Sequence, residues 1–211
     1  MLPVRIFFSK TGRAVYFSHL DLNRAVARLL MRSGLPVAFT EGFNPHARVV
    51  FAAPLAMYQR GLNEIFDFSL TEELPYDEIR DRMNAVTSPF LAIHKAAPPV
   101  MKLSECRWAS YELALETDAP ATEVQAIFEG SVVVTKKTKR SCAQTDISNE
   151  INSVTVQDTE DGVILHCVLA AAPDDYLNPN YIRDFAASRF PVQSCVITRA
   201  GFFNSRLEPF C

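Results

Sequence analysis

The run G-F-N-P-H-A-R at residues 42–48 joins turn-forming residues to side chains that can do chemistry. Asn44-Pro45 favours a turn, and the glycine supplies backbone freedom beside it. His46 and Arg48 lie two residues apart, so they share one face if the chain is extended there. Histidine titrates near neutral pH, and arginine binds carboxylates and phosphates through charged hydrogen bonds. The run therefore predicts a binding loop containing Asn44, His46 and Arg48.

A second polar run, residues 9–25, places cations beside the start of a predicted helix. Ser9, Lys10 and Arg13 surround a Thr11-Gly12 turn, and backbone amides at a helix start attract anions when cations lie nearby. The spacing of a phosphate loop, G-x-x-x-x-G-K-[ST], is absent. The run is equally consistent with a capped helix, in which Ser18 is the cap and Asp21 completes a capping box.

Two histidines and one aspartate are the candidate catalytic residues. If the loops that carry them meet at one end of a sheet, His19, Asp21 and His46 form a set suited to acid–base chemistry or metal binding. The alternative is that both histidines are separate polar surface residues, and we favour it over metal ligation. We therefore predict no metal site.

A third basic run lies at residues 135–146, T-K-K-T-K-R-S-C-A-Q-T-D. Its cations suit contact with RNA phosphates at a hairpin tip, or equally a solvated strand end. Cys142 lies beside them, which would lower the pKa of its thiol, but no neighbouring histidine supports a nucleophile. The cations of this run are Lys136, Lys137, Lys139 and Arg140.

The composition is that of a globular protein, with 211 residues of which 48% are hydrophobic and 21% charged. No stretch reaches the roughly 18 apolar residues of a membrane span, and residues 1–5 do not resemble a signal peptide. Five cysteines without a C-x-x-C pair favour reduced thiols. We expect a cytoplasmic protein with no membrane partner and no bound cofactor.

Positive charge is concentrated near the start of the chain. Residues 1–60 contain eight Arg or Lys and two acids, a net charge of +6, whereas the whole chain carries −3. Arg24, Arg28 and Arg32 recur every four residues, so they line one face of a helix. This distribution predicts a basic face that binds an anion, the alternative being an uneven but solvated surface.

Hydrophobic patterning predicts an α+β fold. In the first half we expect strands at 4–10, 35–39, 47–55, 63–70 and 90–98, with helices after Ser18 and Pro75. In the second half we expect strands at 108–116, 131–139 and 194–203, a hairpin around Asp161-Gly162, and helices at 121–130 and 178–190. These orders predict two ferredoxin-like (βαββαβ-type) subdomains in tandem, at residues 1–99 and 104–211 with Pro98-Pro99 near the linker.

The ordered motifs of the first half resemble a known family. F-S-K-T-G-R at 8–13, S-H-L-D-L at 18–22, R-S-G-L-P at 32–36 and G-F-N-P-H-A-R at 42–48 are similar to those of the radical-SAM-linked domain of unknown function. In bacteria this domain is a stand-alone chain or the C-terminal part of a cobalamin-binding-type radical SAM protein. Two positions depart from its pattern: Ala47 stands where proline is usual, and Asn178-Pro179 where Arg-Pro is usual.

The resemblance implies a partner rather than a reaction, since the family has no established activity. It implies a separate radical SAM enzyme that carries the iron–sulfur cluster, and the gene neighbours of such families point towards RNA. Our first hypothesis is an accessory protein that binds RNA or another phosphate-bearing ligand through the N-terminal basic face. The second is a small enzyme with a His/Asp centre acting on a nucleotide-like substrate. A scaffold for the radical SAM partner is a third.

Overall fold

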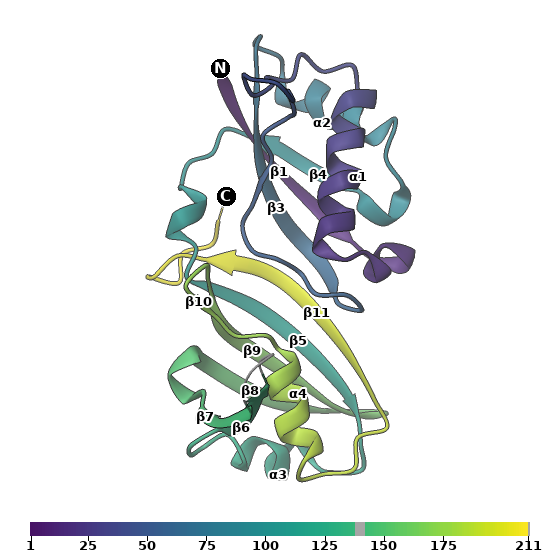
Figure 1. The fold of residues 1–211 in the computed structure, drawn as a ribbon. Coiled ribbons are helices and arrows are strands. Elements are labelled where there is room, and N and C mark those ends of the chain that lie inside the picture. Colours follow the sequence, from purple (N-terminus) through teal and green to yellow (C-terminus); the bar gives the residue numbers. More distant parts are fainter. Residues whose placement is uncertain (138–141, 211) are drawn as a thin grey trace. The chain divides into compact units, whose positions relative to one another are not determined.

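The structure, a computed structural model, describes residues 1–137 and 142–210. The chain divides into two compact units (Figure 1). Unit 1 is Met1–Cys106 together with the C-terminal residues from Pro209, and unit 2 is Arg107–Glu208. The division falls after Cys106, a few residues beyond Pro98-Pro99. Within the described residues, no helix combines the length and the apolar character needed to cross a bilayer.

Unit 1 is an antiparallel sheet with two helices. The strand order is β4-β1-β3-β2, and each neighbouring pair is antiparallel. Its elements in chain order are β1 (Leu2–Lys10), the 3-10 turn η1 (Gly12–Tyr16), α1 (His19–Arg32), β2 (Val50–Phe51), β3 (Arg60–Leu70), α2 (Tyr76–Asn84), η2 (Pro89–Leu91), β4 (Ile93–Ala97) and η3 (Leu103–Glu105).

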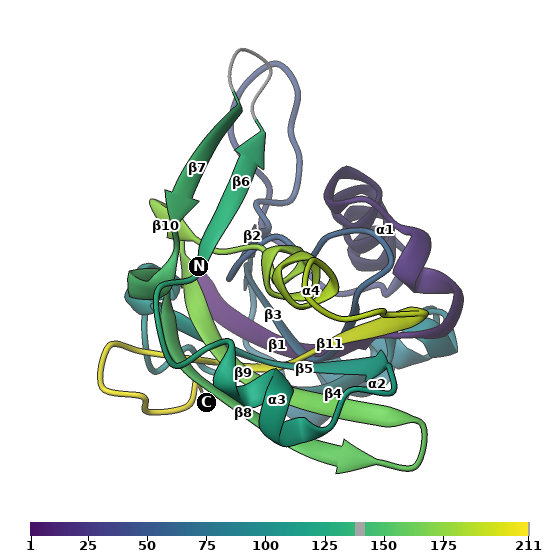
Figure 2. The same ribbon diagram turned by 90° about the horizontal axis from the view of Figure 1, so that it is seen from below.

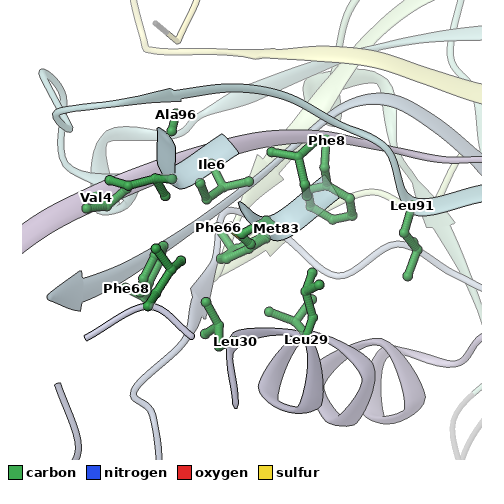
Figure 3. Packing of buried hydrophobic residues seen from close by; sticks show 14 of the residues in the cluster. Val4, Ile6, Phe8, Leu29, Leu30, Phe66, Phe68, Met83, Leu91 and Ala96 are labelled. Carbon is green, nitrogen blue, oxygen red and sulfur yellow. The ribbon is translucent and has the colours of Figure 1, made fainter. Parts of the chain in front are cut away.

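One hydrophobic cluster holds the sheet and both helices of unit 1 together. Alternate residues of β1, Ile6 and Phe8 among them, point to the same side of the sheet as Phe66 of β3. Leu29 of α1 and Met83 of α2 pack against that side (Figure 3). Because both helices contribute to one cluster, they cover the same face of the sheet, and the other face of α1 is available to solvent.

A buried ion pair joins β1 to β3 in unit 1. The guanidinium of Arg5, which is fully buried, donates to both carboxylate oxygens of Asp67 at 2.9 Å and to the backbone oxygen of Met101 at 2.7 Å. The ring of Phe210 lies 5.5 Å from the same guanidinium. This contact explains why the C-terminal residues belong to unit 1.

Unit 2 repeats the strand order of unit 1 and adds a hairpin. Its main strands are ordered β11-β5-β9-β8, each pair antiparallel. The strands β6 and β7 pair only with each other among the described residues, and Figure 2 shows them as a separate hairpin. The elements are β5 (Trp108–Glu116), α3 (Ala121–Ala126), β6 (Val133–Lys137), β7 (Cys142–Asp146), η4 (Ser148–Glu150), β8 (Ile151–Thr159), β9 (Gly162–Ala172), β10 (Asp175–Tyr176), α4 (Asn180–Ala187) and β11 (Ser194–Phe203).

Most predicted elements are present, including the β8–β9 hairpin that turns at Asp161-Gly162. The predicted strands at 35–39 and 47–55 are wrong. Only Val50–Phe51 forms a strand there, besides isolated bridges at Val37 and between Phe39 and Ala47. Prolines at 36, 45 and 54 lack the backbone N–H that a continuous ladder needs. The strands β7 and β10 were not predicted.

Candidate functional site

A groove on unit 1 lies between the second half of α1 and the loop at residues 40–46. Its volume is about 420 Å³. Met31, Phe39 and Pro45 provide most of its apolar wall, while Arg28 and Arg32 add two guanidinium groups from α1. Within the described residues, neither arginine forms an ion pair with an acid. The remaining lining residues are Ala27, His46 and Ala47.

Hydrogen bonds close the 40–46 loop and orient His46. The backbone N–H of Thr40 donates to the oxygen of His46 at 2.9 Å, and the N–H of His46 donates to the Thr40 hydroxyl at 3.2 Å. The ring Nδ1 lies 3.0 Å from the backbone oxygen of Asn44. A carbonyl can only accept, so Nδ1 carries the hydrogen and Nε2 is the nitrogen left to meet a ligand. Gly42 (φ +119°) has a backbone conformation that suits only glycine.

The segment after the loop keeps the alternation of a strand without its ladder. Ala47, Val49 and Phe51 pack against the core of unit 1, whereas His46 and Arg48 are exposed. His46 and Arg48 therefore share one face, as the spacing predicts, and that face is exposed. His46 lines the groove, and Arg48 lies outside the groove lining.

The start of α1 uses His19 and Asp21 for helix structure. Ser18 and Asp21 form a capping box, and hydrogen bonds from Ser18 lower the pKa of the Asp21 carboxyl below its usual value. The Asn23 amide lies 3.0 Å from Nε2 of His19 and donates to the His19 backbone oxygen. The His19 ring packs edge-on against Phe51 at 5.3 Å.

The structure does not bring the three candidate catalytic residues together. His46 faces residues 27–32 of α1, whereas His19 is the first residue of that helix. At a rise of about 1.5 Å per residue, eight residues separate the two by about 12 Å along the helix. In the described part of the chain, no three His, Cys, Asp or Glu side chains are grouped so that they could hold a metal ion. This geometry disfavours the His/Asp enzyme hypothesis.

Two residues predicted for the basic face are buried instead. Lys10 is fully buried, and its Nζ donates to the backbone oxygen of Ala56 at 3.2 Å. Ser9 is 8% exposed, and its backbone N–H donates to Ala92. Both lie at the end of β1, where Lys10 pairs with Gly61 of β3. The assignment of Ser9 and Lys10 to a ligand-binding surface is therefore corrected.

The other predicted N-terminal residues are exposed at different places on unit 1. Arg13 lies on η1 and Arg24 on α1, one turn before the groove, while Asn44 lies in the closed loop.

Gly12 of η1 has a φ of +49°, and a Cβ there would lie 2.4 Å from the Phe90 ring. The turn in F-S-K-T-G-R therefore requires glycine for its conformation and its close approach to Phe90.

The basic run of unit 2 offers less than its sequence predicts. Lys136 donates to both carboxylate oxygens of Glu150, at 2.8 and 3.1 Å, so its charge is already paired. Lys137 ends β6, and Cys142 begins β7. Lys139 and Arg140 lie outside the described residues. Burial raises the pKa of the Cys167 thiol to about 12 and that of Cys195 to about 11, which makes both poor nucleophiles.

Arg32 lines the groove, and the four-residue period that it shares with Arg24 and Arg28 was the sequence signal for it. Sequence reasoning missed two exposed aromatic residues. Phe43 is fully exposed at the loop, and Phe39 lines the groove. Their exposure has no sequence signal, because an aromatic residue beside a turn usually belongs to the core.

The fold and site define an α+β protein with a cationic, partly apolar groove on unit 1. The chain belongs to the family described as "Uncharacterized protein conserved in bacteria (DUF2344)", whose model matches residues 4–179. No curated protein matches the chain.

Eighteen chains of solved structures match this one. One is from "Crystal Structure of a Cbf5-Nop10-Gar1 Complex", with a TM-score of 0.49 and 11% identity, over 94% of this chain and 48% of that chain. The present chain thus spans about half the length of that one. A likeness of this degree carries no argument about function.

Proposed function

We propose that unit 1 binds a phosphate-bearing ligand, RNA in the first place, through the groove and the exposed face of α1 beside it. The observation that carries this proposal is that one groove combines an apolar wall with two arginines, Arg28 and Arg32, neither of which forms an ion pair with a described acid. A nucleotide has both matching parts, an anionic phosphate and a flat base with apolar faces.

Electrostatics favour an anion at this face. Arg24, Arg28 and Arg32 are exposed along α1, and the Asp21 carboxylate interacts electrostatically with Arg24. Asp21, one of two acids in residues 1–60, is committed to the capping box. Arginine binds phosphate oxygens in a bidentate manner, and Nε2 of His46 supplies a further polar contact.

Exposed aromatic residues support RNA over a simple anion. Phe43 projects fully into solvent at the loop that forms one wall of the groove. Bases of single-stranded RNA stack on such rings, and this stacking tolerates any sequence.

The proposal includes two finer statements. The strand orders β4-β1-β3-β2 and β11-β5-β9-β8, each with two helices, support a pair of ferredoxin-like units, the second enlarged by the β6–β7 hairpin. The radical SAM enzyme as partner rests on the sequence motifs at 8–13, 18–22, 32–36 and 42–48 alone. In that role the present chain would hold the RNA, and the partner would carry out the reaction.

Fluorescence anisotropy with a labelled single-stranded RNA tests the binding proposal. We expect Arg28→Ala and Arg32→Ala each to weaken binding about tenfold, because each removes a charged hydrogen bond. Arg206→Ala, an exposed arginine of unit 2, is the matched control for lost charge and should leave the affinity unchanged. Equal effects of all three variants would mean that binding reports net charge and not this groove.

A further inference from the structure

Two exposed tyrosines, Tyr16 and Tyr58, contact each other near the N-terminal end of α1, away from the groove. Tyr16 is 60% exposed and Tyr58 is 69% exposed, although both are large aromatic residues. Their ring centroids lie 5.7 Å apart at an angle of 86°, an edge-to-face contact. Tyr16 belongs to η1, which directly precedes α1 and is seen at its lower end in Figure 1.

The backbone around Tyr58 is held in an unusual conformation. Tyr58 has a φ of +66°, a left-handed value rare for a residue with a side chain. Its N–H donates to the oxygen of Val15 at 2.7 Å, which fastens it to η1. On one side Lys10 donates to Ala56, and on the other Gln59 is buried. Strain that persists because its surroundings enforce it is a feature of functional sites.

The exposed side of α1 connects this pair to the groove. Leu20, Arg24 and Met31 lie within one stripe of the helix, since steps of four and seven residues return to the same side. All three are exposed, Leu20 by 57% and Met31 by 65%. Leu20 and Met31 are eleven residues apart in α1, so the stripe extends over about 16 Å. Arg28 lies at its edge and lines the groove.

Resting on the proposed function, we infer that the ligand is a single strand of RNA on the order of four nucleotides long, rather than a mononucleotide. One base stacks at the Tyr16–Tyr58 pair, the arginines of α1 contact the phosphates between, and another base enters the groove beside Phe43. Aromatic residues at both ends and cations between them match the alternation of bases and phosphates in such a strand.

Charge decides between RNA and a protein helix as the occupant of this stripe. A helix partner would need a continuous apolar surface, whereas here arginines interrupt the apolar residues. Arg13, Arg24 and Arg28 are exposed along the path from η1 to the groove. Asp21 and Glu41 are the acids of residues 1–60, and the Asp21 carboxylate, which stays ionised in the helix cap, offsets one of these three cations. The surface is therefore complementary to a polyanion.

A length series of oligouridylates from one to eight nucleotides tests the inference on the full chain by calorimetry. We expect the affinity to rise steeply up to about four nucleotides and then to level off. Tyr16→Leu should lower the affinity of the longer strands about tenfold and leave uridine monophosphate unaffected, and Tyr16→Phe should bind as the natural protein does. Tyr76→Leu, an exposed tyrosine of α2, is the matched control. Circular dichroism melting checks that each variant folds.

Inorganic polyphosphate of similar charge separates this inference from the function on which it rests. If polyphosphate binds as tightly as the four-nucleotide RNA and Tyr16→Leu changes neither, the stacked strand is wrong while a phosphate-binding groove stands. An affinity for oligouridylates that does not increase beyond one nucleotide would likewise contradict the stacked strand but not the phosphate-binding groove. If neither RNA nor polyphosphate binds, or if Arg28→Ala has no effect on either, the proposed function fails as well.

Discussion

Two pairs of basic residues in unit 1 have opposite surroundings. Arg5 and Lys10 of β1 are fully buried. Arg5 donates hydrogen bonds to the Asp67 carboxylate, and Lys10 donates to the backbone oxygen of Ala56. Arg28 and Arg32 of α1 are exposed and line a groove without an ion pair to a described acid. The same residue types therefore stabilise the fold in one place and are available to a ligand in the other. Charge counted along the sequence does not distinguish these roles.

The first helices of units 1 and 2 also differ in their role, although the two units share a strand order. Both order four antiparallel strands alike, yet the first helix of unit 2 has six residues where that of unit 1 has 14. The Gln125 amide of α3 is bonded to the backbone of β8 at Val154 and Val156. The helix of unit 2 thus protects a strand edge, whereas α1 presents arginines to solvent. A shared plan of strands does not imply a shared site.

The largest expected loss of stability is for a substitution of the buried Arg5. Arg5→Ala should reduce the free energy of unfolding by about 3 kcal/mol or more, because it leaves the Asp67 carboxylate partly buried without its partner. Arg5→Lys keeps the charge but not the bidentate geometry and should lose less. Urea denaturation followed by circular dichroism measures both. A loss below about 0.5 kcal/mol in Arg5→Ala would mean that Arg5 contributes as little to stability as the exposed arginines do.

A smaller loss of stability is expected at the turn before α1. Gly12→Ala places a side chain at a φ of +49° and against the Phe90 ring, so we expect a loss of about 2 kcal/mol. Gly34→Ala is the matched control, since its φ is +66° but a Cβ at this position would meet no atom within 4 Å. It should lose about 1 kcal/mol. Equal losses would show that the Phe90 contact contributes nothing.

The cap of α1 should contribute less again. Ser18→Ala removes the hydroxyl that accepts from the Asp21 backbone, and we expect a loss of about 1 kcal/mol. Ser104→Ala, an exposed serine of η3, is a control expected to change stability little. Thermal melting of the two variants measures the difference. An unchanged melting temperature in Ser18→Ala would contradict the capping role.

The same cap predicts a pH dependence through Asp21. Because hydrogen bonds from Ser18 lower the pKa of its carboxyl in the folded state, the carboxylate adds stability above the ordinary value of 3.8. This contribution should disappear as the pH falls through the lowered folded value. The difference in melting temperature between the natural protein and Asp21→Asn should therefore be present at pH 6 and shrink on acidification. A difference that grows towards low pH would reverse the sign of this argument.

The smallest effect on stability is expected for the exposed group. Arg28→Ala should change the free energy of unfolding by less than about 0.5 kcal/mol, since its guanidinium forms no ion pair with the described residues. Urea denaturation under the conditions used for Arg5→Ala gives the comparison. A loss as large as that of Arg5→Ala would mean that Arg28 stabilises the fold and would remove the basis for a binding role.

Sequence patterns predicted the elements well where they were long and regular. The apolar stripe, Ser18 and Gly34 defined α1 closely, and alternation defined β3. The strands predicted within residues 35–55 were wrong, because the apolar residues alternate as in a strand while the prolines prevent a continuous ladder of hydrogen bonds. Alternation nevertheless predicted that His46 and Arg48 share one face, and both are exposed.

The candidate site was predictable only in part. The four-residue period of the arginines and the G-F-N-P-H-A-R loop pointed to the two walls of the groove, but not to their meeting along residues 27–32. Lys10 shows why: a lysine at a strand end is usually exposed, and only the packing around β1 buries it. The strained Tyr58 likewise depends on its bond to Val15, which is distant in sequence.

Nuclear magnetic resonance of the ¹⁵N-labelled chain during titration with a short single-stranded RNA tests the central claim most directly. The account predicts that shift changes concentrate at the backbone amides of residues 27–32 and 39–47 and saturate with the ligand, and that a strand of about four nucleotides also shifts the amides of Tyr16 and Tyr58. Changes concentrated in residues 107–208, or no changes at all, would contradict it.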